Sequence, residues 1–225
     1  MTIAPPYQNY GNELVLSLVP TVAKRILDVG CGAGDNGRRL REIRRDIDVF
    51  GITHSVEEAA MAAPFLSGVE VLDVEFDSLL PLGTGFDVII FSHVLEHLRD
   101  PVAVLRRFLP LLTEQGFVVI AVPNTLEWRT RFAFLRGRFQ YGDRGILDRT
   151  HLRFFTYATA VAELIEPVRE LELLQSRGRG SAPLGPFRNR FLARPLRALI
   201  DDLAVRKFPN LFAREIALVA KRRGQ

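Results

Sequence analysis

The sequence is poor in the residues that build disulfide frameworks and metal clusters. It holds a single cysteine, Cys31, among 225 residues, with 2 methionines and 1 tryptophan. One cysteine excludes an internal disulfide and any metal site made from several cysteines. No stretch approaches the roughly 18 apolar residues that a membrane span requires, and no basic segment followed by a long apolar run stands at the N-terminus. We therefore expect a soluble, cytoplasmic protein.

Net positive charge is missing from the first half of the chain. Residues 1–128 carry 10 Lys and Arg against 17 Asp and Glu, a net charge of −7, whereas residues 129–225 carry 20 against 9, a net charge of +11. A basic half favours an anionic partner, which leaves nucleic acid, a phosphorylated substrate and an anionic membrane open. A solvated arginine-rich surface is the alternative.

Short apolar runs alternate with helical segments through the first half. The runs are "RILDVG", "DVFGIT", "VEVLDVE", "FDVIIFSH" and "GFVVIAVPN", and their length and composition predict buried strands. Helical spacing lies between them, and "RDPVAVLRRFLPLL" has Asp100 as N-cap and Pro101 at its first helical position. The alternation predicts a parallel sheet covered by helices on both faces.

The stretch "DVGCGAGDNG", which begins at Asp28, contains two overlapping glycine patterns. The pattern from Gly32 to Gly37 has the spacing of a dinucleotide fingerprint, in which the strand runs straight into the first glycine. Here the apolar strand ends just before Gly30, so the turn begins there. The pattern Asp28, Gly30, Gly32, Gly34 therefore fits better. Its glycines let a ligand approach the backbone, and Asp28 can accept a hydrogen bond from a ligand ammonium group.

Three motifs together resemble the class I S-adenosylmethionine-dependent methyltransferases. They are "ILDVGCGAG", "GFDVIIFSHVLEHLRDP" and "LLTEQGFVVIAVPN", in this order over residues 20–125. The resemblance implies an α/β, Rossmann-like, doubly wound sheet of seven strands with helices on both faces, and "EIALVAKR" suits the antiparallel last strand. It also implies one methyltransferase domain over residues 1–225. Within it, residues 1–20 would cover the cofactor, and residues 125–155 and 177–210 would be insertions on the substrate side.

The resemblance also implies which residues bind S-adenosylmethionine. The glycine turn would hold the methionine part, the segment after the third strand would bind adenine, and the end of the fourth strand would line the methionine end. The expected residues are Asp28, Gly30, Cys31, Gly32, Gly34, Thr53, His54, Asp73, Val74, Glu75, Ser92, His93 and Tyr10, with Tyr7 as a further aromatic candidate. Thr53 departs from the family, which has an acidic residue there for the ribose hydroxyls, and a hydroxyl makes a weaker hydrogen bond than a carboxylate.

The letters "HVLEH" match H-x-x-E-H, an inverted zinc-protease pattern. Such a site needs His93 and His97 on one helix face, with Glu96 as the base. Because His93 directly follows a strand, the two histidines are not expected to share a helix. We therefore expect no metal.

Methyl transfer to a hydroxyl requires removal of the hydroxyl proton, and an imidazole suits this because its ordinary pKa lies near neutral pH. We expect His151 to be the general base, oriented by Asp148, with His93 or His97 as the alternative base. His151 and Asp148 belong to the segment "GILDRTHLRFFT", which lies in the irregular region after the fifth strand. The alternative is structural: Asp148, His151 and Arg153 would only tie this loop together.

The segment "PNTLEWRTRFAFLRGRFQYGDRGILDRTHLRFFT" resembles a subgroup associated with sugar and surface-polysaccharide pathways. Arginine binds phosphate or carboxylate through two parallel hydrogen bonds. The arginines expected to do so are Arg129, Arg131, Arg136, Arg138, Arg149 and Arg153. We expect an O-methyltransferase that acts on an anionic small molecule or glycan, such as a sugar hydroxyl in a polysaccharide or natural-product pathway.

Three other functions and one other partner remain open. An RNA methyltransferase would suit the basic half, but "VPNT" lacks the N-P-P-Y or D-P-P-Y pattern, so nucleic acid is not the expected partner. A non-catalytic partner protein could retain the fold, and a nicotinamide oxidoreductase is the weakest alternative. The basic amphipathic stretch "FRNRFLARPLRALIDDLAVRKF" predicts a helix pair covering the sheet, with peripheral contact to an anionic membrane as its alternative.

Overall fold

A seven-stranded sheet forms the centre of the computed structural model, which describes residues 10–224. The strands are β1 (Arg25–Val29), β2 (Asp48–Thr53), β3 (Gly68–Val71), β4 (Phe86–Ser92), β5 (Leu112–Pro123), β6 (Leu171–Gly180) and β7 (Ala213–Arg222). They lie in the order β3-β2-β1-β4-β5-β7-β6. The first five are parallel, and β7 runs antiparallel between β5 and β6. The doubly wound sheet with an antiparallel last strand is therefore confirmed.

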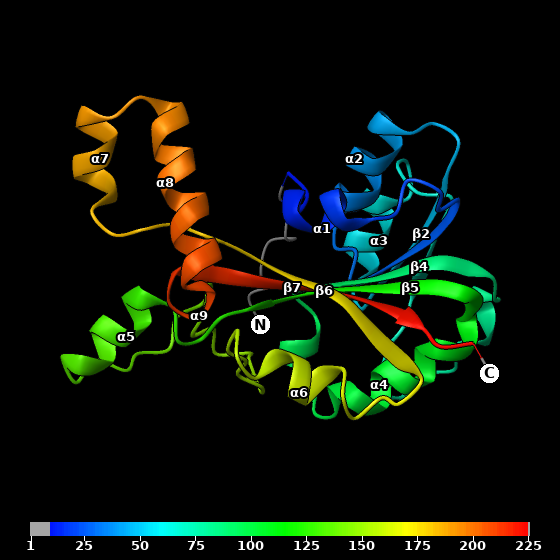
Figure 1. Ribbon diagram of the computed structural model, residues 1–225. Coiled ribbons are helices and arrows are strands. Elements are labelled where there is room, and N and C mark those ends of the chain that lie inside the picture. The colour runs from blue at the N-terminus through cyan, green and yellow to red at the C-terminus, as the bar shows by residue number, and fades with distance from the viewer. Residues whose placement is uncertain (1–9, 225) are drawn as a thin grey trace.

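Helices cover both faces of the sheet, as expected (Figure 1). One face carries α1 (Glu13–Leu18), α2 (Asp35–Ile43) and α3 (Val56–Ala62), and the other carries α4 (Pro101–Phe108) and α6 (Ala160–Leu164). Three short 3₁₀ helices are η1 (Leu80–Leu82), η2 (Leu95–His97) and η3 (Leu109–Leu111). The remaining helices are α5 (Trp128–Leu135), α7 (Gly185–Phe191), α8 (Arg194–Lys207) and α9 (Pro209–Phe212).

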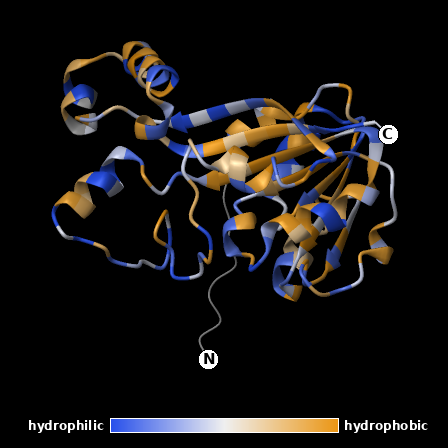
Figure 2. Cartoon of the chain, turned by 60° about the horizontal axis from the view of Figure 1, so that its bottom comes forward, coloured by the Kyte–Doolittle hydropathy of each residue, from blue (hydrophilic) through white to orange (hydrophobic). Residues whose placement is uncertain are grey.

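The central strand β4 shows why the apolar runs are continuous. It sends Ile89 and Phe91 into the core on one face, and Val88 and Ile90 into the core on the other, because successive side chains point to opposite faces. All four are fully buried. Figure 2 shows the same apolar band along the strands at the centre of the molecule. A parallel sheet buried on both faces thus produces the run "FDVIIF".

Local signals start and end α4 where the sequence predicts. Asp100 Oδ1 accepts a hydrogen bond from the Ala103 N–H at 2.9 Å, and Pro101 occupies the first turn. Pro110 lies in η3, so the α-helix ends at Phe108 and the chain continues as a 3₁₀ turn. A proline cannot donate the hydrogen bond that would prolong the helix.

The second half departs from the expected layout. Strand β6 continues to Gly180, into the start of the segment 177–210 that was expected to be a substrate-side insertion. Helix α7 and most of α8 stand off the sheet (Figure 1), so the expected covering helix pair is wrong for these parts. Of α8, Val205 is buried, whereas Phe187 and Phe191 of α7 are each 62% exposed. Within the described residues, no helix has the length and apolarity to cross a bilayer.

Candidate functional site

Buried polar side chains gather at one edge of the sheet, where the parallel strands end. Asp28 and Glu96 are 0% exposed, Thr53 is 2% exposed, and Glu215 is 6% exposed. The carboxyl ends of β1, β2 and β4 meet at this edge, which is where open α/β sheets bind ligands. Glu215 reaches the same edge because β7 is antiparallel and begins there.

The glycine turn after β1 has the backbone that the second glycine pattern predicts. Gly30, Gly32 and Gly34 have φ angles of 70°, 53° and 83°, in the left-handed region that favours glycine. Gly37 instead lies inside α2, where an added Cβ would be 2.1 Å from Leu66 Cδ2. The first three glycines therefore form the turn, and Gly37 allows close packing of α2.

Asp28 lies at the base of this turn with one oxygen unused. Its Oδ1 accepts a hydrogen bond from Asn36 Nδ2 at 3.4 Å, and its Oδ2 has no hydrogen-bond partner among residues 10–224. Burial raises the pKa of Asp28 to about 7, although the Asn36 hydrogen bond lowers it. A buried carboxyl group with a free oxygen beside a left-handed turn suits a ligand that donates hydrogen bonds, as the ammonium group of S-adenosylmethionine would.

Thr53 does not present a free hydroxyl at the end of β2. Its Oγ1 donates to Glu58 Oε2 at 2.6 Å. Glu58 belongs to the first turn of α3, which Ser55 caps by accepting from the Glu58 N–H at 3.3 Å. This chain has Thr53 where the family has an acidic residue, and the carboxylate of Glu58, five residues later, reaches the same place. We did not predict Glu58, although S-x-x-E is a helix-start pattern that fixes its place.

The predicted adenine segment forms a turn that is tied to α4. Asp73 Oδ1 accepts from the Glu75 N–H at 2.9 Å, and the Asp73 N–H donates to Asp77 Oδ2 at 2.7 Å. Glu75 Oε1 accepts from the N–H groups of Arg99 and Asp100 at 2.9 and 3.2 Å. The Glu75 carboxylate thus accepts hydrogen bonds from the chain itself, and Asp73 and Asp77 are exposed acidic residues of this turn.

The other predicted cofactor residues contribute unequally. The Cys31 N–H donates to the Ile52 carbonyl at 2.8 Å, which ties the turn to β2, and burial raises the pKa of the Cys31 thiol. His54 is exposed, and Tyr10 is 89% exposed, so neither packs over the turn. Tyr7 lies outside the described residues.

Asn12 connects the parts of the edge, and no sequence signal pointed to it. Its N–H donates to Asn36 Oδ1 at 2.8 Å, and its Nδ2 donates to Ser92 Oγ at 3.3 Å and to Glu215 Oε1. Asn36 in turn contacts Asp28, so hydrogen bonds run from the glycine turn to the ends of β4 and β7. Ser92, predicted to line the methionine end, belongs to this network.

His93 is held between two carboxylates. Its Nδ1 lies 3.1 Å from Glu96 Oε1, and its Nε2 lies 2.9 Å from Glu215 Oε1. Burial lowers the pKa of His93, but the hydrogen bonds to Glu215 and Glu96 outweigh it and raise the pKa to about 10. The raised pKa favours a protonated His93 at neutral pH, which counts against its expected role as alternative base.

Glu215 is a site residue that sequence reasoning missed. Its Oε2 accepts from Arg179 Nε at 2.9 Å, while Oε1 contacts His93 and Asn12. The available signal was an acidic residue in the otherwise apolar strand "EIALVA". A buried charge of this kind requires a partner, but its partners come from distant segments.

His97 and His151 meet beside Glu96. Their rings are 4.7 Å apart between centroids, at an angle of 75°. The carbonyl of Glu96 accepts from the N–H groups of Leu152 and Arg153 at 2.8 and 3.0 Å, which holds the His151 segment against η2. Burial lowers the pKa of His97, so its ring is neutral at neutral pH.

Asp148 does not orient the His151 ring, which corrects our expectation. His151 Nδ1 lies 3.0 Å from the carbonyl oxygen of Ile146. The Asp148 carboxylate instead accepts from the N–H and hydroxyl of Thr150 at 2.9 and 2.7 Å. Thr150 Oγ1 lies 3.0 Å from His97 Nδ1. Asp148 is therefore connected to His97 through Thr150, within the turn that the His151 N–H closes on the Asp148 carbonyl.

The arginines expected to bind an anionic acceptor mostly contact the chain itself. The contacts are Arg129 with Glu127 and Ser181, Arg131 with the carbonyls of Leu126 and Asn210, Arg136 with the Phe132 ring, Arg149 with Asp143, and Arg153 with the carbonyl of Arg99. These five guanidinium groups hold the inserted segments together, so the negative charge of the acceptor stays a prediction.

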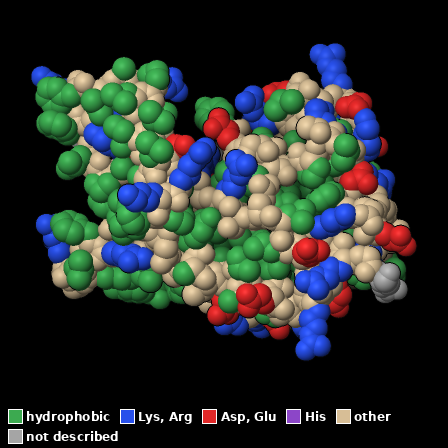
Figure 3. Space-filling view, in the orientation of Figure 1, with side chains coloured by type: hydrophobic (Ala, Val, Ile, Leu, Met, Phe, Trp, Pro, Cys, Tyr) green, Lys and Arg blue, Asp and Glu red, His purple; other side chains and the backbone are tan. Residues whose placement is uncertain are grey.

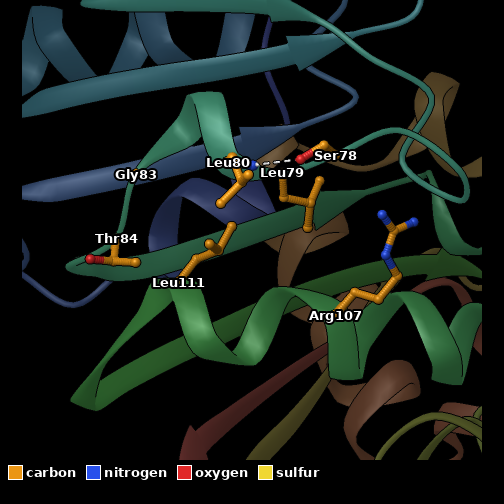
Figure 4. Close-up of a pocket in the computed structure, with 7 residues that line it drawn as sticks. All are labelled: Ser78, Leu79, Leu80, Gly83, Thr84, Arg107 and Leu111. Atoms are coloured by element: carbon orange, nitrogen blue, oxygen red, sulfur yellow. Dashed lines mark hydrogen bonds between the residues drawn. The ribbon is translucent and has the colours of Figure 1, made fainter.

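A surface groove of about 410 Å³ lies away from this edge (Figure 4). Two of its lining residues lie at the amino ends of strands: Thr84 is two residues before β4, and Leu111 directly precedes β5. Its lining residue Arg107 donates to the carbonyls of Val74 and Asp77. The groove is therefore on the side of the sheet opposite the buried carboxyl and imidazole groups, and we assign it no chemistry.

A family model described as "Methyltransferase domain" matches residues 7–166. The ubiquinone biosynthesis O-methyltransferase of Xanthomonas euvesicatoria pv. vesicatoria is 28% identical over 126 residues, covering 54% of this chain and 51% of that protein. The enzyme of the same name from Psychrobacter cryohalolentis is 29% identical over 144 residues, covering 60% and 54%. The chain thus spans about half the length of these curated relatives.

Solved structures share the fold at low sequence identity. The plantazolicin methyltransferase BpumL in complex with SAH has a TM-score of 0.57 at 18% identity, covering 93% of this chain and 80% of that one. A SAM-dependent methyltransferase from Archaeoglobus fulgidus has a TM-score of 0.57 at 19% identity, covering 89% and 87%. The [4+2]-cyclase SpnF has a TM-score of 0.59 at 20% identity, covering 95% and 80%.

Proposed function

The chain belongs to the methyltransferase-domain family, the class I S-adenosylmethionine-dependent methyltransferases, and from this premise we propose that it transfers a methyl group to a hydroxyl of a small-molecule or glycan acceptor. The observation that carries this proposal is the contact between the glycine turn and the segment that bears the imidazole pair. An added Cβ at Gly30 would lie 2.4 Å from Val94 Cγ2. His97 follows three residues later and meets His151.

S-adenosylmethionine supplies an already activated methyl group, so the protein has to place the acceptor oxygen in line and remove its proton. His151 can accept that proton. The Ile146 carbonyl fixes the N–H at His151 Nδ1, which leaves the lone pair at Nε2. His97 has the same arrangement through Thr150. Protonated His93 supplies a fixed positive charge between its two carboxylates.

Glu58 would bind the ribose hydroxyls in place of the family's acidic residue on β2. Its carboxylate reaches the end of β2 and contacts the Thr53 hydroxyl at 2.6 Å. The ribose hydroxyls would then donate hydrogen bonds to the same carboxylate, which the Thr53 hydroxyl holds in position by donating to it as well. Asp28 would bind the ammonium group through its unused oxygen.

The acceptor is proposed from two resemblances that share a hydroxyl. The inserted segment after β5 resembles enzymes of sugar and polysaccharide pathways, and the curated relatives are named ubiquinone O-methyltransferases. Oxygen methylation is common to both. We propose a sugar hydroxyl as the acceptor. Methylation of a phenolic hydroxyl instead would replace this assignment.

The projecting helices support peripheral contact with an anionic membrane. Figure 3 shows hydrophobic side chains gathered on α7 and α8 together with arginine. Phe187, Phe191, Leu199 and Leu203 are 62%, 62%, 52% and 55% exposed. Apolar area beside positive charge is the composition that binds anionic lipid surfaces.

Transfer of a radiolabelled methyl group from S-adenosylmethionine tests the proposal. The assay offers sugars and catechols, each both as the free hydroxyl compound and as its O-methylated counterpart. We expect label in a free hydroxyl compound and none in the counterpart whose hydroxyl is already methylated. His151→Ala should lower transfer by about 10²- to 10⁴-fold, the usual worth of a general base, while S-adenosylhomocysteine binding is unchanged. Near-normal transfer by His151→Ala would contradict the assignment of the base.

The same assay separates the alternatives. Label in RNA, and not in either small-molecule series, would replace the proposal by the RNA methyltransferase. The fold also occurs in a [4+2]-cyclase, so fold alone does not establish transfer. A chain that binds no S-adenosylhomocysteine at millimolar concentration would be the non-catalytic partner protein.

A further inference from the structure

Three potential metal ligands converge beside the proposed acceptor site. One carboxylate oxygen of Glu96 and one ring nitrogen each of His97 and His151 lie within 4.8 Å of one another, among the residues that the structure describes. Ligand atoms bound at about 2.0–2.2 Å to one tetrahedral ion lie about 3.3–3.6 Å apart, so binding would draw these side chains together by up to about 1.5 Å. This set differs from the H-x-x-E-H pattern, because it contains His151, 54 residues after His97, in place of His93.

Glu96 carries an unexplained oxygen at this place. The side chain is 0% exposed, and its Oε1 contacts His93 Nδ1. Its Oε2 is buried and has no hydrogen-bond partner within residues 10–224. An unpartnered buried carboxylate oxygen is costly, and a bound cation would satisfy it.

Both histidines are prepared as ligands by the groups behind them. His151 Nδ1 contacts the carbonyl of Ile146 at 3.0 Å, and His97 Nδ1 contacts the Thr150 carbonyl at 3.3 Å and hydroxyl at 3.0 Å. Metal-binding histidines usually donate one ring N–H to such oxygens, which directs the other nitrogen at the metal. Asp148 extends this arrangement by accepting from the Thr150 hydroxyl at 2.7 Å.

We propose that Glu96, His97 and His151 bind one divalent first-row transition-metal ion through a carboxylate oxygen and the two Nε2 atoms. Two imidazoles and one carboxylate suit zinc, iron or cobalt, whereas Mg²⁺ prefers an all-oxygen set. Three protein ligands leave at least one coordination position open. Both histidines are half-buried, so the site is open to solvent and to an acceptor.

The role of the ion rests on the proposed function, although its binding does not. The acceptor hydroxyl would take the open position, where the ion lowers the pKa of that hydroxyl. Its proton passes to water, and an oxygen lone pair forms the new bond to the methyl carbon. The carbon–sulfur bond breaks with its electron pair going to sulfur, so the sulfonium becomes a thioether. With the ion bound, the His151 Nε2 lone pair is taken by the metal, so the ion and water replace the general-base role proposed above for His151, while methyl transfer to a hydroxyl is retained.

Titration of the chelator-treated full chain with Co²⁺, followed by visible absorption, tests the site. We expect one equivalent of Co²⁺ with a ligand-field spectrum, displaced by Zn²⁺ and unaffected by excess Mg²⁺. His151→Ala should weaken binding by more than about 100-fold, and Thr150→Val by about 10- to 100-fold, as loss of an outer partner does. His54→Ala removes an exposed histidine outside the cluster and should leave binding unchanged.

Absence of stoichiometric Co²⁺ binding, or equal binding by wild type and His151→Ala, would overturn the metal site. Because Glu96→Gln can disturb His93, the surface variant His151→Ala carries the test. Calorimetry with S-adenosylhomocysteine on the same samples keeps the two proposals apart. Cofactor binding without Co²⁺ binding removes only the metal, and Co²⁺ binding without cofactor binding removes the proposed function and leaves the metal site.

Discussion

The proposed cofactor side and the proposed acceptor side of the sheet edge are built from different parts of the chain. The cofactor side uses the backbone of one continuous turn, with three left-handed glycines over a buried carboxyl group. The acceptor side uses side chains from η2 and from the segment 146–153, joined through carbonyl contacts. A main-chain site depends on local geometry, whereas a side-chain site depends on how distant segments pack.

The largest expected effect is a difference in the free energy of unfolding between variants of the core sheet and variants of the projecting helices. Phe91→Ala should lower the free energy of unfolding by about 3–5 kcal/mol, because the ring is fully buried against Phe108. Phe187→Ala, at a 62% exposed position, should change it by less than about 0.5 kcal/mol. Urea unfolding of both variants measures this. Equal losses would show that α7 is packed in solution.

The role of the glycine turn can be tested by comparing Gly30 with a glycine that has the same left-handed backbone but no neighbouring side chain. Gly30→Ala meets the left-handed φ cost of about 1–2 kcal/mol, and its Cβ would lie 2.4 Å from Val94 Cγ2, so overpacking adds about 1–3 kcal/mol. Gly85→Ala has φ 85° and no atom within 4 Å of an added Cβ, so only the first cost applies. Unfolding and cofactor titration of both variants should show the larger loss in Gly30→Ala. Identical behaviour would remove the turn's special role.

Glu58→Gln tests the carboxylate that replaces the family's acidic residue. A hydrogen bond to a charged group is worth about 1.5–3 kcal/mol, so affinity for S-adenosylhomocysteine should fall by at least about tenfold. Glu57→Gln is the matched control, because the Glu57 carboxylate accepts from the Ser55 hydroxyl at the exposed start of the same helix. Calorimetry of both variants decides, and an equal affinity would return the ribose contact to Thr53 and His54.

Cofactor binding should depend on pH through Asp28. Its pKa is raised from 3.8 to about 7 without ligand, so its contribution to stability is full below pH 3.8 and is lost as pH rises through 7. The ionised form binds the ligand cation, so affinity should rise with pH up to about 7, by at most about tenfold per unit. Asp28→Asn should flatten this profile. A wild-type profile that is flat from pH 5 to 8 would contradict the assignment.

The smallest effect is expected at the projecting helices. Vesicles with anionic lipid should sediment the protein more than neutral vesicles, and Arg190→Ala should weaken this by about 1 kcal/mol. Arg45→Ala, on the opposite half of the chain, serves as the control. Equal sedimentation with both vesicle types would exclude the membrane contact.

The difference between a main-chain site and a side-chain site explains which features could be predicted from the sequence. The first five strands follow from local apolar periodicity, and the glycine turn follows from where the first strand ends. The resemblance carried by three ordered motifs implies a seven-stranded sheet with an antiparallel last strand. Each of these is found in the structure. The partners of His93 and His151 could not be predicted, because Glu215 lies 122 residues from His93. The Ile146 carbonyl replaced Asp148 because a four-residue turn decides where each side chain points.

Calorimetric titration of the full chain with S-adenosylhomocysteine tests the central claim most directly, that the edge holding Asp28 and the glycine turn is a cofactor site. We predict saturable one-to-one binding by the wild type, the same affinity in Gly85→Ala, and a loss in Gly30→Ala. A wild-type chain that is folded and shows no binding at millimolar ligand would contradict it.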